Sequence, residues 1–380
     1  MKMSQWRGAF GHLAKTIAMS TRICFLVRHL NDGQSGGAEL QVRLYSQALA
    51  RRGWDVWLIG EGFPLETEKM EDGVRYVCLP PRRRGLGILN LPYLKSVFDR
   101  IRPHVCYQRV KLDYTYWTRR LAHRLGGKFL FAFSHDQECL PGALAGFPGD
   151  FVSRFVAALA DQGIRKADLL LCQTAEQKQL IQENFARDAV IVKNGHPLPR
   201  NAQTVPGRSE VLWVNNLKPV KQPELFLQLA KELREEAAVF TMIGARGAYP
   251  LEAELARPGR SGKLNFLGEQ PLATVNDRLW GCRALVNTSL AEGFPNTFIQ
   301  AWARFVPVIS LQVDPDGVIA KHQLGFWSGD FPRMVSHVRA LIHEPELAMA
   351  MGNNGRAYVE REHDVTENVR KLDQTLRQLT

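Results

Sequence analysis

The 380-residue sequence lacks both long apolar runs and clustered cysteines. No apolar stretch approaches the roughly 18 residues that a membrane-spanning helix needs. The six cysteines are scattered, and no two have the spacing of a zinc-ligand pair or a redox motif. Most lie in or beside apolar runs, where cysteine behaves as a small hydrophobic side chain. We therefore expect a cytoplasmic protein with neither a disulfide framework nor a structural zinc.

Acidic residues are absent from positions 1–20. This segment is a poor secretory signal, because His12 and Lys15 interrupt its short apolar centre. We expect an extension without regular structure, with an organelle transit peptide or a membrane-surface helix as the alternatives.

Positive charge is in excess over the whole chain, with 49 Lys and Arg against 38 Asp and Glu and a formal net charge of +11. Such a surface attracts nucleic acid, anionic lipid or phosphorylated ligands without choosing among them. The densest cluster, Arg82–Arg84, precedes several apolar residues and the aromatic Tyr93. A basic clamp beside apolar residues fits a bilayer surface better than a duplex groove. A solvated loop beside a buried helix is the equally open alternative.

Strand-like and helix-like segments alternate along the chain, which predicts an α/β fold with parallel sheets covered on both faces. Residues 194–209 contain three prolines, two glycines and no periodicity, and are typical of a linker. The predicted organisation is a first Rossmann-like domain over 21–200, a second over 201–355 and a charged C-terminal helix over 356–380. Two such halves place a cleft between the carboxyl ends of their strands.

The turn that contains Glu292 is the most informative stretch. A strand predicted at 284–288 enters a Gly/Pro turn, and a helix is predicted to open near Asn296. Glu292 is therefore delivered to the carboxyl end of a strand, where the unpaired N–H groups of the new helix favour an anion. A carboxylate beside a phosphate-sized anion site suits group transfer from a nucleotide diphosphate.

The segment Glu292-Gly293-Phe294-Pro295-Asn296-Thr297, with the Pro307-Val308-Ile309-Ser310 strand after its helix, resembles the signature of family 4 glycosyltransferases. Further matches, in the same order along the chain, are Gly36-Gly37-Ala38-Glu39, Ser134-His135-Asp136, Val192-Lys193-Asn194-Gly195 and Lys221. The resemblance covers most of the chain from Arg22 onward. It implies the GT-B fold, in which an acceptor-side domain faces a nucleotide-sugar-binding domain across a cleft and the C-terminal helix crosses back.

The resemblance also implies roles for single residues. The first glutamate of the family motif, which contacts the donor sugar, matches Glu292. The second, which grips the ribose, is replaced by Gln300, whose amide can still hydrogen-bond hydroxyls. Lys221 matches a diphosphate-binding lysine. The arginine that accompanies it in relatives is replaced by Asn216, and Lys218 is the candidate substitute.

The other candidate substrate contacts come from three loops. By resemblance, His135 hydrogen-bonds a donor-sugar hydroxyl and Asp136 lines the acceptor side. Gly36 and Gly37 let the backbone approach a phosphate or sugar. The remaining candidates frame Glu292 and are Gly293, Phe294, Pro295, Asn296 and Thr297.

No metal or other cofactor is expected, because relatives with this fold use Lys, Arg and helix dipoles in place of a metal. Asp314-Pro315-Asp316 formally matches the manganese-binding pair of a different glycosyltransferase fold. Its position after a strand and before Gly317 is more typical of a turn.

These observations predict a retaining hexosyltransferase of cell-surface polysaccharide or glycolipid synthesis, with Glu292, Lys221 and His135 as catalytic residues. The expected partners are a nucleotide-sugar donor, a saccharide or lipid-linked saccharide acceptor and a membrane surface at its inner face, but no nucleic acid. Two alternatives stay open. One is a nucleotide-sugar epimerase or hydrolase of the same fold. The other, suggested by Asn216 and Gln300, is a non-catalytic glycan- or nucleic-acid-binding protein.

Overall fold

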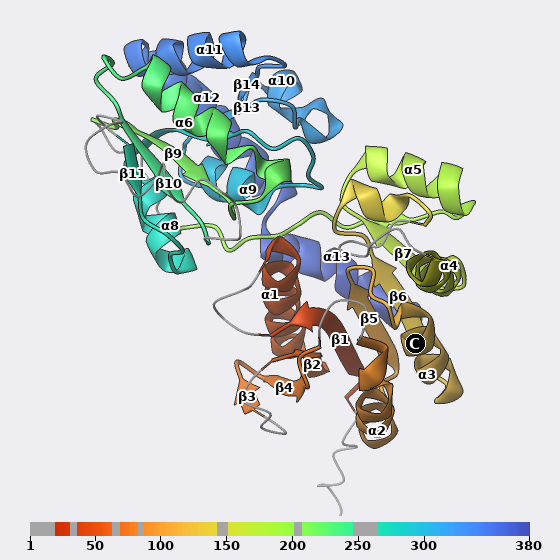
Figure 1. The fold of residues 1–380 in the computed structure, drawn as a ribbon. Coiled ribbons are helices and arrows are strands. Elements are labelled where there is room, and N and C mark those ends of the chain that lie inside the picture. Colours follow the sequence, from red (N-terminus) through yellow and green to blue (C-terminus); the bar gives the residue numbers. More distant parts are fainter. Residues whose placement is uncertain are drawn as a thin grey trace, which may run out of the picture.

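Two separate sheets form the framework of the protein (Figure 1). The computed structural model describes residues 20–30, 36–62, 69–82, 87–142, 151–200, 207–245 and 264–380. The first sheet has the strand order β3-β4-β2-β1-β5-β6-β7-β8, and the second has the order β11-β10-β9-β12-β13-β14. Among the described strands, every pairing is parallel except β3 with β4. The prediction of an α/β protein with two Rossmann-like domains is confirmed.

The central strands of the first sheet are buried on both faces. Along β1, Ile23, Phe25 and Val27 pack on one face, whereas Cys24 and Leu26 pack on the other. The strands are β1 (Arg22–His29), β2 (Asp55–Glu61), β3 (Lys69–Glu71), β4 (Val74–Leu79), β5 (Val105–Arg109), β6 (Lys128–Ala132), β7 (Leu169–Cys172) and β8 (Val190–Ile191). The helices are α1 (Gly37–Arg51), α2 (Leu91–Ile101), α3 (Thr115–Arg124), α4 (Phe151–Arg165) and α5 (Ala175–Phe185), with short 3-10 turns η1 (Gly87–Asn90) and η2 (Asp136–Cys139).

The second sheet carries the loop that contains Glu292. Its strands are β9 (Glu210–Val214), β10 (Val239–Ile243), β11 (Leu264–Phe266), β12 (Cys282–Asn287), β13 (Val308–Ser310) and β14 (Gly325–Trp327). The helices are α6 (Pro223–Glu232), α8 (Leu272–Leu279), α9 (Asn296–Trp302), α10 (Val318–His322), α11 (Phe331–His343) and α12 (Pro345–Glu362), with turns η3 (Pro219–Lys221) and η4 (Pro315–Gly317). As in the first domain, hydrophobic cores lie on both faces of the sheet.

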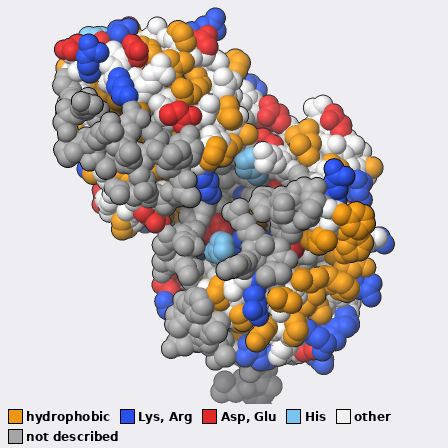
Figure 2. Space-filling view, viewed as in Figure 1, with side chains coloured by type: hydrophobic (Ala, Val, Ile, Leu, Met, Phe, Trp, Pro, Cys, Tyr) orange, Lys and Arg blue, Asp and Glu red, His pale blue; other side chains and the backbone are white. Residues whose placement is uncertain are grey.

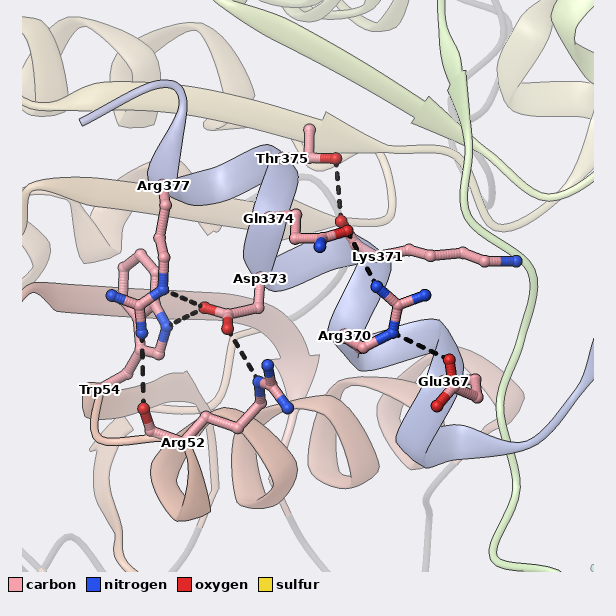
Figure 3. Close-up of polar contacts among 9 residues, drawn as sticks. All are labelled: Arg52, Trp54, Glu367, Arg370, Lys371, Asp373, Gln374, Thr375 and Arg377. Carbon is pink, nitrogen blue, oxygen red and sulfur yellow. Dashed lines mark hydrogen bonds and ion pairs between the residues drawn. The ribbon is translucent and has the colours of Figure 1, made fainter.

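The last helix, α13 (Val365–Arg377), leaves the second domain and packs on α1 of the first (Figure 1). Val365, Val369, Leu372 and Leu376 join the core beneath α1. The Asp373 carboxylate accepts hydrogen bonds from Arg52 Nε at 2.8 Å, Trp54 Nε1 at 2.7 Å and Arg377 Nε at 2.9 Å (Figure 3). The crossing predicted for the C-terminal helix is confirmed. The predicted segment 356–380 consists of the end of α12, a break at His363–Asp364, and α13.

Helices long and apolar enough to cross a membrane are absent from the described part of the chain. The predicted N-terminal extension lies outside the described residues, apart from Ser20. Of the Arg82–Arg84 cluster, only Arg82 is described. Its Nε donates to Asn90 Oδ1 at 3.2 Å, so this side chain is tied to η1.

Candidate functional site

Lys221 and Glu292 form an ion pair at the carboxyl edge of the second sheet. Lys221 ends the turn that follows β9, and Glu292 lies in the loop that follows β12. Because β9 and β12 are parallel neighbours, their carboxyl ends bring the two loops together. The side chains of Lys221 and Glu292 are 16% and 14% exposed. The structure therefore joins two residues that the sequence separates by 71 positions.

Hydrogen bonds from neighbouring side chains fix this pair. Ser289 Oγ donates to Glu292 Oε1 at 2.8 Å, the oxygen that the Lys221 ammonium also contacts. Behind them, Trp213 Nε1 donates to Thr288 Oγ1 at 2.9 Å, and Thr288 Oγ1 donates to the Lys221 carbonyl at 2.7 Å. The lysine is thus held through its own backbone by the buried core of β9 and β12.

Asn296 connects the two domains. Its Nδ2 donates to the Gly37 carbonyl at 2.9 Å, and its Oδ1 accepts from Gln41 Nε2 at 2.9 Å and from Asn194 Nδ2 at 3.3 Å. The His196 ring Nε2 lies 3.2 Å from the same oxygen. A Cβ atom on Gly37 would lie 2.6 Å from Asn296 Nδ2, so a larger residue there would displace the Asn296 side chain from this contact. The structure brings the Gly36-Gly37 loop and the Glu292 loop together.

The N-terminal end of α1 already holds an acidic side chain. Gly36 is the N-cap residue of α1, and the Glu39 carboxylate accepts hydrogen bonds from the backbone N–H groups of Gly36 and Glu39. Burial raises the pKa of Glu39, although these N–H groups and the positive charges of Arg109 and Lys218 oppose the rise. Lys218 is thus near enough to Glu39 for its positive charge to act on this pKa.

Gly293 meets the loop of the first domain that contains His135 and Asp136. A Cβ atom on Gly293 would lie 2.5 Å from the Ser134 carbonyl, so no larger residue fits there. His135 is half-buried, and its Nδ1 accepts from the Gln137 N–H at 3.3 Å. Asp136 Oδ1 accepts from Gln177 Nε2 at 2.9 Å. Burial raises the pKa of Asp136, and the negative charges of Glu292 and Asp316 add to this rise.

A pocket of about 400 Å³ opens between the domains beside Glu292. The first domain contributes Asp136, Thr174 and Glu176 to its lining. The second contributes the loop from Leu290 to Gly293, several residues between 312 and 317, and the half-exposed ring of Trp327. Glu292, predicted to contact the donor sugar, and Gly293 and Asp136, predicted to bind substrate, thus line one pocket.

The remaining predicted residues differ in what their side chains contact. Phe294 is 5% exposed and belongs to a hydrophobic core of the second domain, and its ring lies tilted against that of His363 with centroids 4.5 Å apart. Pro295 is the N-cap residue of α9, and Thr297 is half-buried in the first turn. Gln300 is 4% exposed, and its Nε2 has no hydrogen-bond partner among the described residues. Asn216 is exposed, and its Oδ1 accepts from the Ala245 N–H at 3.3 Å.

Both carboxylates of the Asp314-Pro315-Asp316 segment accept hydrogen bonds from backbone N–H groups. Asp314 accepts from Ile319 at 2.7 Å and from Ala320 at 3.3 Å. Asp316 accepts from Ala175 at 3.0 Å and from Glu176 at 3.1 Å, across the domain junction at the start of α5. Within the described ranges, no group of three or more His, Cys, Asp or Glu side chains is arranged to hold a metal ion.

Sequence reasoning missed Arg109 and Gln41, and it named Asn194 only as part of a matching motif, without a role. Arg109 ends β5 and is 3% exposed, and its Nη2 donates to Asn194 Oδ1 at 2.8 Å. Gln41 donates to the Gly195 carbonyl at 3.0 Å and accepts from the Gly195 N–H at 2.9 Å. An arginine at the carboxyl end of a buried strand was the one signal in the sequence, because such a charge is rarely buried without a partner.

Two protein-family models match the chain one after the other. The model described as "Glycosyl transferase 4-like domain" matches residues 36–195, and the model described as "Glycosyl transferases group 1" matches residues 199–358. The first match ends after β8 and the second begins before β9, so each model corresponds to one of the two sheets.

Solved structures with the same fold cover nearly the whole chain. Sucrose-phosphate synthase from Thermosynechococcus elongatus has a TM-score of 0.78 at 15% identity, over 94% of this chain and 99% of that chain. HepE from Anabaena, in complex with UDP and glucose, has a TM-score of 0.73 at 16% identity, over 94% and 100%. The lipopolysaccharide outer core galactosyltransferase WaaB has a TM-score of 0.62 at 16% identity, over 95% and 100%. Taken together, the two family models and the shared fold indicate that this chain belongs to the GT-B glycosyltransferase superfamily.

Proposed function

We propose that this chain is a retaining hexosyltransferase that uses a nucleotide diphosphate-sugar as donor. The observation that carries the proposal is the Lys221–Glu292 ion pair beside the interdomain pocket. When an anionic diphosphate binds the Lys221 ammonium in place of Glu292, the Glu292 carboxylate becomes available to accept hydrogen bonds from hydroxyl groups of the sugar. One pair of residues can thus bind both halves of the donor.

In the proposed reaction, the bond between the anomeric carbon and the diphosphate oxygen breaks while the acceptor oxygen bonds to the same face of that carbon. The acceptor proton passes to the leaving phosphate oxygen. Negative charge grows on the diphosphate as an oxocarbenium-like transition state forms, and Lys221 stabilises that charge. A positioned cation of this kind lowers the barrier by about 3 kcal/mol.

Glu292 and His135 orient the donor sugar in this scheme. Glu292 Oε1 is already held by Lys221 and by Ser289, which favours a role in orientation over covalent attack on the anomeric carbon. His135 and Asp136 approach from the first domain, next to Gly293. His135 is proposed to hydrogen-bond a sugar hydroxyl, and Asp136, which lines the pocket, is proposed to lie on its acceptor side.

Gln300 is the proposed ribose contact, since its buried Nε2 has no hydrogen-bond partner among the described residues and can donate to a ribose hydroxyl. Lys218 is the proposed second cation for the diphosphate, in place of the arginine that Asn216 replaces. A thermal-shift comparison of UDP, GDP and ADP, in wild type and Gln300→Ala, tests this donor site. The nucleotide that stabilises the wild type should stabilise the variant less.

Transfer is proposed to need neither a metal ion nor another cofactor. The backbone N–H groups that follow Glu292 and the Lys221 ammonium supply the positive potential for the diphosphate. Both carboxylates of the Asp314–Asp316 segment are occupied by backbone N–H groups. Transfer rates should therefore be unchanged after dialysis against EDTA, and a loss that manganese restores would contradict this part of the proposal.

The proposed acceptor is a saccharide or a lipid-linked saccharide of a cell-surface polysaccharide or glycolipid, used at the inner face of the membrane. Two observations support it. The chain carries a formal charge of +11, which favours an anionic surface. One protein of the same fold is a galactosyltransferase of the lipopolysaccharide outer core.

A transfer assay tests the proposed function. The protein is incubated with UDP-, GDP- and ADP-sugars, with and without saccharide acceptors, while free nucleotide and glycosylated product are measured. We expect acceptor-dependent product with one donor, lost in Lys221→Ala and kept in Lys371→Ala, an exposed lysine on α13. Donor consumption that needs no acceptor would instead indicate a hydrolase or epimerase. Tight donor binding without turnover would indicate a non-catalytic glycan-binding protein.

A further inference from the structure

Large hydrophobic side chains are exposed at the start of α4. Phe151 is 84% exposed, Val152 68% and Phe155 58%, all within the first two turns of the helix. Ile88, Leu89 and Tyr93, around the start of α2, are 37%, 51% and 52% exposed. Figure 2 shows hydrophobic side chains gathered on this side of the first domain, with Lys and Arg among and around them. A soluble monomer rarely exposes a contiguous group of large apolar side chains, so this group indicates a site of interaction with a partner.

Both groups lie at the same edge of the first sheet. The helices α2, α3 and α4 lie side by side on one face of that sheet and contact one another in this order. Each leads into the amino end of a parallel strand, so the first turn of each helix lies near the carboxyl ends of the strands. The exposed residues of α2 and α4 therefore flank the edge of the sheet at which the substrate pocket opens.

Positive charge is in excess on this surface. Among the exposed residues of α2, α3 and α4, all of which the structure describes, six are Lys or Arg and none is Asp or Glu: Lys95, Arg100, Arg120, Arg124, Arg154 and Arg165. The acids of these helices are Asp99, half-exposed and ion-paired with Lys95 and Arg124, and Asp161, buried and ion-paired with Lys111. An anionic partner matches this surface.

Arg154 is the cation that local helix chemistry does not explain. Lysine and arginine stabilise the C-terminal turn of a helix, which accounts for Arg100, Arg124 and Arg165. Arg154 instead lies near the N-terminal end of α4, where the helix dipole disfavours a cation and where α4 has no acidic residue. It lies between Phe151 and Phe155 in the sequence, so the start of α4 can make an apolar and a cationic contact with the same partner.

Aromatic residues on α3 continue the surface between α2 and α4. Tyr116 and Trp117 are half-buried, with rings in an edge-to-face arrangement and centroids 5.1 Å apart. The guanidinium groups of Arg119 and Arg120 lie 5.7 Å and 5.9 Å from the Tyr116 ring centroid. Tyrosine, tryptophan and arginine together are typical of the interface between water and lipid headgroups.

The geometry points to the α2–α3–α4 surface as a docking site for an anionic lipid bilayer, with Phe151, Val152 and Phe155 inserted among the headgroups. Apolar insertion and cationic attraction act together in such a contact. A second copy of this chain fits less well, because a symmetric contact would place six cations against six. A nucleic-acid duplex also fits less well, because its phosphate backbone offers no apolar group for the exposed phenylalanine rings to contact.

Docking in this orientation places the substrate pocket next to the bilayer. This consequence rests on the proposed function, since it explains how a lipid-linked acceptor reaches the pocket. The binding surface itself does not depend on catalysis.

Vesicle co-sedimentation of the full chain tests the inference. The vesicles are phosphatidylcholine alone or phosphatidylcholine mixed with phosphatidylglycerol, and the proteins are wild type, Phe151→Ser/Phe155→Ser, Arg154→Ser and a control, Met349→Ser. Met349 is 50% exposed on α12 of the second domain. We expect binding to the anionic vesicles only, reduced about tenfold in the double variant, reduced less in Arg154→Ser and unchanged in the control.

Several outcomes would overturn the inference: wild type that does not bind anionic vesicles, or a double variant that binds them as tightly as wild type. A wild-type dimer that the double substitution converts to a monomer would assign the surface to a second copy instead. Donor turnover with a water-soluble acceptor should be the same in the double variant and in wild type. Vesicle binding can be measured without any turnover, so its failure and failure of the proposed function are distinguishable.

Discussion

The Lys221 ammonium and the Glu292 carboxylate face each other across the carboxyl ends of β9 and β12, and Ser289 holds the carboxylate from the side. The pair lies where the second domain meets the His135 loop of the first. Each member is oriented by groups that belong to the buried framework, so the separation of cation and carboxylate is set before substrate binds. Such preorganisation is what electrostatic catalysis requires.

Removing members of this group should give graded losses of activity. Glu292→Ala removes the contact to the donor sugar and should lower turnover by roughly tenfold or more. Ser289→Ala removes one hydrogen bond to Glu292 Oε1 and should cost roughly threefold, because the Lys221 contact remains. Steady-state transfer rates measure both, with thermal unfolding as the check on folding. Wild-type rates in Glu292→Ala, or a larger loss in Ser289→Ala, would reject the assignment.

Asn296 should matter for stability as well as for activity. It exchanges hydrogen bonds with Gly37, Gln41 and Asn194, all in the first domain. Asn296→Ala removes these hydrogen bonds between the domains, so the free energy of unfolding should fall by about 1–3 kcal/mol. Urea denaturation measures the change. Asn354→Ala, which removes an exposed asparagine that donates to the Gln323 carbonyl, is the control and should have little effect.

Much of this site could be predicted from the sequence, because many of its residues lie close together along the chain. The strand, turn and helix around Glu292 are contiguous, and α9 begins at Asn296, where the turn chemistry predicts a helix to open. Lys221 could be predicted because the loops of neighbouring parallel strands converge. An apolar face that includes Leu40, Leu44, Ala48 and Leu49, followed by Gly53, predicts a helix from about 38 to 52, and α1 spans Gly37–Arg51.

The rest depends on which distant segments meet. Gln41 contacts Gly195 and Asn296 only because the two domains are joined there, and no local pattern marks a glutamine for such a contact. Phe294 belongs to the signature, yet its ring packs against that of His363, which lies 69 positions further along the chain. The strand β14 is only Gly325–Trp327, too short for its alternation to be read from the sequence.

Buried histidines at the domain crossing should make the fold sensitive to acid. Burial lowers the pKa of His363 to about 3 and that of His196 to about 4, from 6.5 in both cases. Below pH 6.5 the unfolded chain therefore binds protons on these rings that the folded chain does not. Stability should fall as the pH falls from 6.5 towards 4, by up to about 1.4 kcal/mol per pH unit for each histidine.

Urea denaturation of wild type and His363→Asn across this pH range measures the effect. The asparagine amide can donate to the Asn194 carbonyl as His363 Nδ1 does, at 2.7 Å, but it does not titrate. The variant should therefore lose stability less steeply with acid. His343→Asn, at a side chain that is 61% exposed, is the matched control. Identical slopes for wild type and His363→Asn would show that this ring does not govern the acid response.

The anomeric configuration of the product tests the central claim most directly. The wild-type enzyme is given the donor sugar that supports transfer, and the new glycosidic linkage is followed by NMR from the first turnovers. Same-face attack, with Lys221 on the departing diphosphate and Glu292 orienting the sugar, predicts that the product keeps the configuration of the donor. A product of inverted configuration would contradict this mechanism.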